Sequence, residues 1–248
     1  MQTQLMRTEL LLGEAGIEKL SKARVAVFGI GGVGGYVTEA LCRSGVGALD
    51  LIDHDTVSVT NLNRQVIALH STVGQFKTDV MEKRLRDINP DVKITVHKCF
   101  YLPETKDQFD FSVYSYVVDA VDTVTAKLLL AEEAKKAGVP LIRSMGTGNK
   151  LDPSKLQVSD VFETSVDPLA RVMRRELRKR GIDHLKVVWS TEEPRKPLLD
   201  ARTIRMMEGS PVPEESVRLK DIPGSCAFVP AAAGLLIASE VVRDLLKE

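Results

Sequence analysis

A strand-like stretch that runs into glycines, with an aspartate further on, could form a nucleotide site. Val25–Phe28 is apolar and leads directly into Gly29, Gly31 and Gly32. Glycines at this point permit a tight turn and a close approach of backbone to phosphate, and the N-terminus of a following helix favours negative charge. Asp53 stands about 20 residues beyond, the spacing at which an acid hydrogen-bonds a ribose hydroxyl. These features fit NAD and ATP equally; alone, the glycines could serve packing and Asp53 could cap a loop.

Polar residues between positions 61 and 77 favour an ATP that is cleaved. The segment Asn61-Leu62-Asn63-Arg64-Gln65 follows the second predicted strand, where an arginine can be aimed at phosphates. An enzyme that cleaves ATP must neutralise charge on the leaving pyrophosphate, which a bidentate arginine and a lysine can do. Arg64 and Lys77 supply such a pair, whereas a dinucleotide site relies on backbone and helix dipole. Lys77 begins a predicted helix, where a cation is unfavourable without an anionic partner; the other interpretation is a solvated residue.

Two carboxylates follow another apolar strand, in Val118-Asp119-Ala120-Val121-Asp122. Mg²⁺ prefers one or two carboxylates together with phosphate oxygens, so either Asp119 or Asp122 could hold the metal that accompanies ATP. Asp122 lies nearer the loop and is the better candidate. It could also, or instead, cap the helix that follows.

A strongly basic helix is predicted in the second half of the chain. Arginines recur on one of its faces at Arg171, Arg174, Arg175 and Arg178. Such a stripe suits phosphate contacts to an RNA backbone, but charged runs also occur on solvated faces, and both interpretations stand. Cys226 precedes an apolar helix without an obvious histidine partner, which favours a buried cysteine over a nucleophile.

The composition is that of a soluble globular protein. The 248 residues are 44% hydrophobic, and 34 basic residues balance 34 acidic ones, so net charge does not indicate a nucleic-acid binder. The three cysteines form no C-x-x-C pair and the four histidines show no metal-ligand spacing. The N-terminus does not resemble a secretory signal, and the most apolar stretch, 226–239, is too short to span a bilayer. We therefore expect a reducing, cytoplasmic setting and no membrane partner.

Strand and helix patterns alternate through the first half of the chain. Strands are predicted over Arg24–Phe28, Leu49–Asp53, Lys93–Cys99, Tyr116–Asp119 and Leu141–Ser144, and helices over Val33–Ser44, Lys77–Asn89 and Val124–Ala137. This alternation indicates a Rossmann-like α/β fold, with a doubly wound, mostly parallel sheet and helices on both faces. Ligands of such sheets bind beyond the carboxyl ends of the strands. Four residues fall at such ends and should converge on one crevice: Gly31, Asp53, Asp122 and Gly146.

The second half is less regular. Strands are predicted over Leu156–Phe162 and Lys186–Ser190, and helices over Asp167–Arg180 and Pro230–Lys247, the last packing back on the sheet. The polar, proline-rich segment 191–224 predicts a long crossover or lid. We expect one domain over residues 1–248. Its nucleotide-binding half would span 1–150, and a substrate-binding half with an antiparallel extension would span 151–248.

Together, these motifs resemble the ubiquitin-activating-enzyme-like superfamily of ATP-dependent adenylyltransferases, which includes the activators of thiamine and molybdopterin sulfur carriers. The glycine turn, Asp53, the 61–65 segment, Val73-Gly74-Gln75-Phe76-Lys77 and the 119–122 segment stand in family order over nearly the whole chain. The resemblance implies an ATP site formed by Gly29, Gly31, Gly32, Asp53, Asn61, Asn63, Arg64 and Lys77. It implies that Asp122 positions Mg²⁺; Thr123 stands where the family commonly has asparagine.

The resemblance also bears on assembly and catalysis. Arg7 matches an arginine that reaches ATP in the partner subunit, which implies a homodimer. The catalytic groups that the family pattern implies are Arg7, Arg64, Lys77 and Asp122.

Carrier-protein activators of this superfamily typically have two C-x-x-C zinc pairs in the second half, and this chain has none. In Leu151–Asp160, Asp167–Ala170 and Trp189–Glu192 it is more similar to the tRNA threonylcarbamoyladenosine dehydratase branch. That resemblance implies ATP-dependent cyclisation of threonylcarbamoyladenosine in tRNA through an acyl adenylate, without an enzyme nucleophile. It places tRNA contacts on the arginine helix and admits a sulfur-relay protein as a further partner.

Two other functions stay open at this point. The first is an adenylyltransferase that activates the C-terminal glycine of a small sulfur-carrier protein. The second is a non-catalytic nucleotide-binding or NAD-sensing module, in which Arg64 and Lys77 would be dispensable and NAD would bind as well as ATP.

Overall fold

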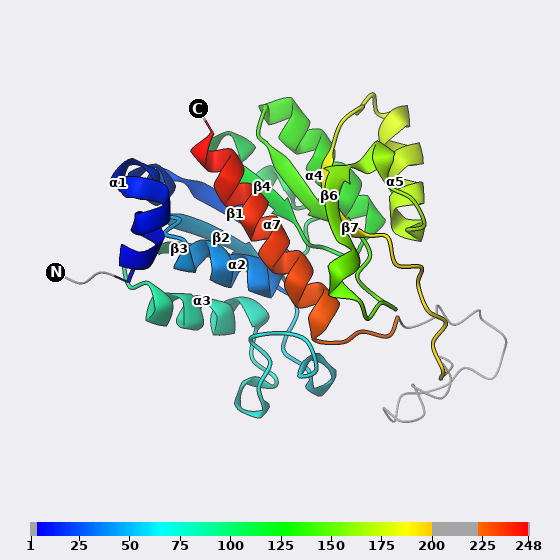
Figure 1. The fold of residues 1–248 in the computed structure, drawn as a ribbon, viewed down its shortest axis with the longest axis horizontal. Helices are drawn as coiled ribbons and strands as arrows, with labels where there is room; N and C mark the ends of the chain where they lie inside the picture. Colours follow the sequence, from blue (N-terminus) through cyan, green and yellow to red (C-terminus); the bar gives the residue numbers. More distant parts are fainter. Residues whose placement is uncertain (1–3, 200–222, 248) are drawn as a thin grey trace.

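In the part of the chain that the structure describes, seven strands form a single sheet in the order β3-β2-β1-β4-β5-β7-β6 (Figure 1). The computed structural model describes residues 4–199 and 223–247. The strands are β1 (Arg24–Phe28), β2 (Ala48–Ile52), β3 (Lys93–His97), β4 (Tyr116–Asp119), β5 (Leu141–Ser144), β6 (Leu156–Asp160) and β7 (Lys186–Ser190). The α-helices are α1 (Met6–Lys22), α2 (Gly34–Arg43), α3 (Lys77–Ile88), α4 (Val124–Ala137), α5 (Pro168–Lys179) and α7 (Phe228–Leu246).

The strand order reverses between β1 and β4. From β1 the chain builds outward through β2 and β3, and from β4 it builds the other way through β5, always with parallel pairing. β7 continues the parallel sheet beside β5, and β6 pairs antiparallel with β7 at the edge. A doubly wound, mostly parallel sheet with an antiparallel extension is thereby confirmed. Its switch point, beyond the carboxyl ends of β1 and β4, is where such sheets bind ligands.

Helices cover both faces of the sheet and give the molecule two apolar cores. On one face α2 and α7 pack side by side (Figure 1), and Val37, Leu41 and Ile237 are fully buried there. On the other face α4 and α5 meet, and Phe28, Leu130 and Met173 are buried among them. A sheet covered on both sides favours nearly continuous apolar strands, as in Val25–Phe28. The sheet therefore holds the strand ends rigidly in place.

Most predicted elements are confirmed to within two residues. β6 ends at Asp160, earlier than the predicted Phe162, because the Asp160 carboxylate accepts a hydrogen bond from the Phe162 N–H and starts a 3-10 turn. The last helix begins at Phe228, so Pro230 lies in its first turn, and it packs on the sheet as predicted. Of the predicted lid over 191–224, residues 200–222 lie outside the described part. Among the helices described, none is long and apolar enough to cross a membrane.

Candidate active site

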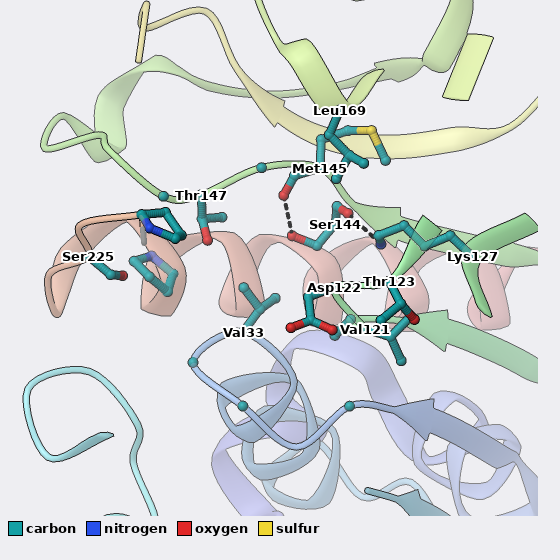
Figure 2. Close-up of a pocket in the computed structure, with 18 of the residues that line it drawn as sticks. Val33, Val121, Asp122, Thr123, Lys127, Ser144, Met145, Thr147, Leu169 and Ser225 are labelled. Carbon is teal, nitrogen blue, oxygen red and sulfur yellow. Dashed lines mark hydrogen bonds between the residues drawn. The ribbon is translucent and has the colours of Figure 1, made fainter. Parts of the chain in front are cut away.

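A cavity of about 600 Å³ opens at the switch point of the sheet. Its walls are the loops that follow β1, β2, β4 and β5, together with the start of α5 and of α7. The four residues expected to converge all line it: Gly31, Asp53, Asp122 and Gly146. Figure 2 shows Asp122 between the turn that carries Val33 and the opposite wall, which carries Ser144 and Met145. The topology thus brings together strand ends far apart in the sequence.

The glycine turn presses closely against the end of β4. Gly29 has φ +91°, and a Cβ there would lie 2.6 Å from the Ala120 carbonyl oxygen. A Cβ on Gly34 would lie 1.7 Å from the carbonyl oxygen of Gly29. Both positions therefore require glycine, for backbone conformation at Gly29 and for space at both.

The Asp53 carboxylate holds this turn in place. One of its oxygens accepts a hydrogen bond of 2.7 Å from the backbone N–H of Ile30, and the other accepts one of 2.9 Å from the N–H of Asp55. Asp53 is largely buried but lines the cavity. A carboxylate oxygen accepts more than one hydrogen bond, so contact with a ribose hydroxyl stays a prediction.

Arg64 lies over the glycine turn. A Cβ on Gly32 would lie 3.5 Å from the Cγ of Arg64, so the aliphatic part of the Arg64 side chain packs on the backbone of the turn. Its guanidinium donates to two neutral acceptors, the Thr60 carbonyl oxygen at 2.9 Å and Asn63 Oδ1 at 2.8 Å. Burial lowers the pKa of Arg64, but no carboxylate in the described chain pairs with it. Its positive charge is uncompensated and borders the cavity.

The two asparagines of the segment hold the loop that carries Arg64. Asn61 is buried and its Oδ1 accepts a hydrogen bond of 3.1 Å from the Ser58 N–H, which closes the local turn. Asn63 donates from Nδ2 to the Ser225 carbonyl oxygen at 3.0 Å and so joins the segment to the approach to α7. Of the two, only Asn61 lines the cavity.

Lys77 is buried at the start of α3 and lines the cavity. Its anionic partner is Asp55, whose Oδ2 lies 2.6 Å from Nζ. Sequence reasoning foresaw the need for such a partner but did not find this one. The same carboxylate also pairs with His54, and Asp53 is committed to the backbone. The close cluster of Asp53, His54 and Asp55 is therefore held together internally, by its own ion pairs and hydrogen bonds.

The structure separates the two candidate metal carboxylates. Asp122 is exposed, lines the cavity, and makes no hydrogen bond or ion pair within residues 4–199 and 223–247. Asp122 does not cap α4, because the N-cap residue of that helix is Thr123. Asp119 is completely buried and bound by two cations. A free carboxylate at a strand end beside phosphate-binding groups suits Mg²⁺, so Asp122 fits the metal and Asp119 does not.

The ion cluster around Asp119 was missed by sequence reasoning. Lys127 Nζ donates to Asp119 Oδ1 at 2.9 Å and to the Ser144 carbonyl oxygen at 3.0 Å (Figure 2 shows the second contact). Arg143 donates to the other oxygen of Asp119 and to the carbonyl of Lys127. One feature of the sequence could have indicated this cluster. A lysine in α4 and an arginine in β5 stand at positions that the apolar pattern assigns to the protein core.

The opposite wall of the cavity contains a third buried lysine, after Lys77 and Lys127. Lys150 Nζ donates to the Gly146 carbonyl oxygen at 2.8 Å and lies 3.3 Å from Asp167 Oδ2. The other oxygen of Asp167 accepts a 2.9 Å hydrogen bond from the Ala170 N–H and caps α5. This pairing fixes the 146–150 loop against α5, so the arginine helix begins in the cavity wall.

The four arginines of α5 are not equivalent. Arg174 is half-buried and donates to the carbonyl and hydroxyl oxygens of Thr164. The other three side chains are exposed: Arg171, Arg175 and Arg178. None of the four lines the cavity, although Pro168 and Leu169, at the start of the helix, do.

Two further predicted positions lie outside the cavity. Cys226 precedes α7, as predicted, but it is half-buried where burial was expected, because the residues on either side of it lie in the exposed approach to the helix; its Sγ lies 3.6 Å from the Lys150 carbonyl oxygen. Arg7 is exposed on α1 and does not line the cavity of its own chain.

A parallel sheet with a glycine turn at its switch point, and with cations around that turn, defines an α/β nucleotide-binding protein. Comparison with known families narrows this class. The model of the ThiF family matches residues 1–248, and the chain belongs to that family.

The chain is similar over nearly its full length to curated members of one branch. It is 45% identical over 247 residues to the tRNA threonylcarbamoyladenosine dehydratase of Bacillus subtilis (strain 168), covering 99% of this chain and 95% of the relative. The enzyme of that name from Escherichia coli (strain K12) is 36% identical over 250 residues, covering 96% of this chain and 92% of the relative.

Solved structures agree with these relatives. The crystal structure of the E. coli dehydratase TcdA in complex with ATP superposes with a TM-score of 0.84 at 34% identity, covering 98% of this chain and 93% of that one. E. coli MccB with ATP shares the fold at a TM-score of 0.66 and 20% identity. The sequence-based assignment to the superfamily is confirmed.

Proposed function

We propose that the protein is an ATP-dependent tRNA threonylcarbamoyladenosine dehydratase. The observation that carries the proposal is the cavity that Arg64 and Lys77 line together with the glycine turn, while a separate wall, from Gly146 to Lys150, is left for a substrate. The relatives with this name match both halves of the chain, and one of them has been solved with ATP. Binding of ATP on the first wall and of the modified adenosine against the second is the arrangement that this chemistry needs.

The reaction proceeds in two steps on the substrate. A carboxylate oxygen of the threonylcarbamoyl group forms a bond to the α-phosphorus of ATP, and the bond to the leaving pyrophosphate breaks. The carbamoyl group then attacks the activated carbonyl carbon, which closes a ring and releases AMP and a proton. The attacking group is tethered to its target at high effective concentration, so no enzyme nucleophile is needed. The half-buried Cys226 is consistent with this, because it lies outside the cavity lining.

The protein contributes charge neutralisation and orientation. Arg64 carries an uncompensated charge over the glycine turn, and Lys77 presents its ammonium from the start of α3. These cations stabilise the negative charge that grows on the pyrophosphate in the transition state. Asp122 would hold Mg²⁺, which neutralises phosphate charge when it is bound.

We assign tRNA contacts to the exposed arginines of α5. This helix starts at the cavity wall and leads away from it, so a tRNA whose modified base enters the cavity can lay its backbone along Arg171, Arg175 and Arg178. Arginine contacts of this kind position a nucleic acid without reading its sequence.

We further propose a cytoplasmic homodimer in which Arg7 reaches the partner's ATP. Arg7 is exposed on α1, and Leu10 and Leu11 on the same helix are 78% and 85% exposed. Adjacent exposed leucines on a helix favour burial against another surface. A second copy of the chain would cover them and bring Arg7 to a neighbouring cavity.

The test is AMP release from ATP in the presence of defined clients. Threonylcarbamoylated tRNA should stimulate AMP release and yield a ring-closed nucleoside in the digest, whereas the same tRNA without the modification should not. Stimulation only by a carrier protein ending in diglycine would replace this proposal with carrier activation. Equal binding of NAD and ATP without turnover would indicate a sensing module.

A further inference from the structure

The buried ion cluster beneath the cavity contains two cations and one carboxylate. Lys127 and Arg143 both pair with Asp119, and the side chains of all three are at most 1% exposed. Buried charges are normally balanced, because an unpaired charge away from water is costly. With both cations protonated, these three groups carry one more positive than negative charge; burial acts to lower the pKa of Lys127, and the carboxylates of Asp119 and Asp122 act to raise it.

Within the described part of the chain, neither cation has all of its hydrogen-bond donors paired. Lys127 Nζ has three N–H donors, of which Asp119 and the Ser144 carbonyl use two. Arg143 Nη1 has no hydrogen-bond partner among residues 4–199 and 223–247. Asp122 is the next carboxylate along the chain, but it forms no ion pair with either group. Arg143 does not line the cavity, whereas Lys127 does, so the remaining N–H of Lys127 is the donor that points to an anion supplied from outside.

The position of Lys127 indicates which anion this is. Lys127 lines the cavity where the end of β4 meets the end of β5, on the side of Ser144 and Met145 (Figure 2). Arg64 and Lys77 belong to the segments after β2, on the other side of Asp122. The triphosphate already has those two cations. Among residues 4–199 and 223–247, the substrate side of the cavity lining has no other unbalanced cation, because Lys150 is matched by Asp167.

We propose that Lys127, supported by Arg143, is the specificity determinant that draws the substrate's free carboxylate toward the α-phosphorus. This inference rests on the proposed function, since it assigns a carboxylate-bearing substrate to the second wall. The attraction between Lys127 and the carboxylate is strong because it acts in the buried base of the cavity and not through bulk water. Adenylation consumes the negative charge of the carboxylate, so the cluster favours the unreacted acid over its neutral analogues.

The test compares Lys127→Met with Lys127→Arg, which keeps the charge. Lys136→Met is the matched control, because it removes an exposed lysine from the same helix. Three quantities are measured for each variant: ATP affinity, the KM for threonylcarbamoylated tRNA in AMP release, and the melting temperature. A fourth measurement uses competition by the free nucleoside threonylcarbamoyladenosine and by its methyl ester, which lacks the negative charge.

Lys127→Met should raise the KM for the tRNA by about tenfold or more, the equivalent of one lost charged contact of about 1.4 kcal/mol. ATP affinity should stay close to that of the wild type. The preference for the acid over the ester should disappear in Lys127→Met and persist in Lys127→Arg. The fold should tolerate the change, because Asp119 keeps Arg143 as its partner.

Three results would overturn the inference. Loss of ATP affinity with an unchanged KM for tRNA would assign Lys127 to the nucleotide phosphates. A lower melting temperature with unchanged kinetics and an intact ester preference would make the cluster purely structural. Equal competition by the acid and its ester in the wild type would show that the substrate's carboxylate does not bind at this site. If Lys127→Met fails to fold, this comparison in the wild type decides the question alone. If the wild type itself shows no tRNA-stimulated AMP release, the proposed function has failed instead.

Discussion

Arg64 and Lys77 are held by the protein in different ways, and their substitutions should differ accordingly. The Arg64 guanidinium rests on neutral oxygens of Thr60 and Asn63, so its removal leaves no buried carboxylate without a partner. Removal of Lys77 leaves Asp55 without its closest cation. Arg64 is therefore the cleaner probe of catalysis, because a loss of activity there cannot be traced to a broken ion pair.

We expect Arg64→Ala to reduce tRNA-stimulated AMP release by about 10²- to 10³-fold, the usual effect of deleting one transition-state donor. The melting temperature should change little. Steady-state assays of AMP release check this, with Arg86→Ala as the control, because Arg86 pairs with Glu82 on the surface of α3. Unchanged turnover in Arg64→Ala would remove this residue from the catalytic groups.

The limits of prediction from sequence are clear at individual residues. Gly31, Asp53 and Arg64 could be placed around one cavity because their spacing follows a recurring pattern of turn, strand end and loop. Asp55, the partner of Lys77, could not, because the pairing depends on a turn of the loop after β2 that no periodicity encodes. The arginine stripe was recognised, but contact of Arg174 with Thr164 depends on tertiary packing.

Among the elements, α7 is attached to the sheet by a polar contact as well as by its apolar face. Asp244 accepts hydrogen bonds from Tyr116 of β4, from Lys186 of β7 and from Lys247. Burial acts to raise the pKa of Asp244, but these donors outweigh it and lower the pKa to about 2. The carboxylate therefore contributes stability above its unfolded-state pKa, and that contribution is lost as pH falls through the folded value.

Asp244→Asn should lower the free energy of unfolding by about 1–2 kcal/mol near neutral pH, following from the size of the shift. The difference from the wild type should shrink as the pH falls from about 4 toward 2, because the wild-type carboxylate is then protonated in both states. Urea unfolding at several pH values measures it. A difference that does not vary with pH would mean that lost packing, and not charge, explains the effect.

The α5 helix carries a separate prediction about RNA. Charge reversal at Arg171, which is exposed and makes no ion pair in the described residues, should weaken tRNA binding and reduce the salt dependence of binding by about one counterion. Lys83→Glu, an exposed charge reversal on α3 across the sheet, is the control. Binding titrations at several salt concentrations measure the slope. If both variants bind alike, the stripe is a solvated face.

Helices and strands were predicted best where a single pattern of apolar residues determined them. β4 is apolar on both faces up to Asp119, β1 is apolar after Arg24, and β2 is apolar apart from the buried Asp50. Each of the three strands ends at, or directly before, a glycine or an acid, which explains their close agreement with the structure. The α1 helix was not predicted, because Gly13, with φ +71°, breaks its regular pattern. It forms nonetheless because its last turns bury Leu20 in the core and its Lys19 binds carbonyl oxygens at the end of α7.

At the scale of the whole molecule, a shared active site can be tested by mixing subunits. If Arg7 acts in the partner's cavity, Arg7→Ala and Arg64→Ala are each inactive, but a mixed dimer contains one site with both arginines intact. Random reassortment of equal amounts should restore about a quarter of wild-type AMP release, since half of the dimers are mixed and each has one working site. Mixtures that stay inactive after exchange would show that Arg7 does not act in the partner's cavity.

The pairing of β1, β4 and β5 as neighbours in one sheet has a further consequence. Strands lie about 4.8 Å apart, so the nucleotide turn after β1 and the substrate wall after β5 are separated by about 10 Å, with the end of β4 midway. A single sheet cannot widen or narrow this gap as a hinge between domains would. The sheet therefore sets a fixed distance between the nucleotide and the substrate. We therefore expect a substrate whose carboxylate ends one or two bonds short of the α-phosphate to bind without being adenylated, so that the site selects substrates by length as well as by charge.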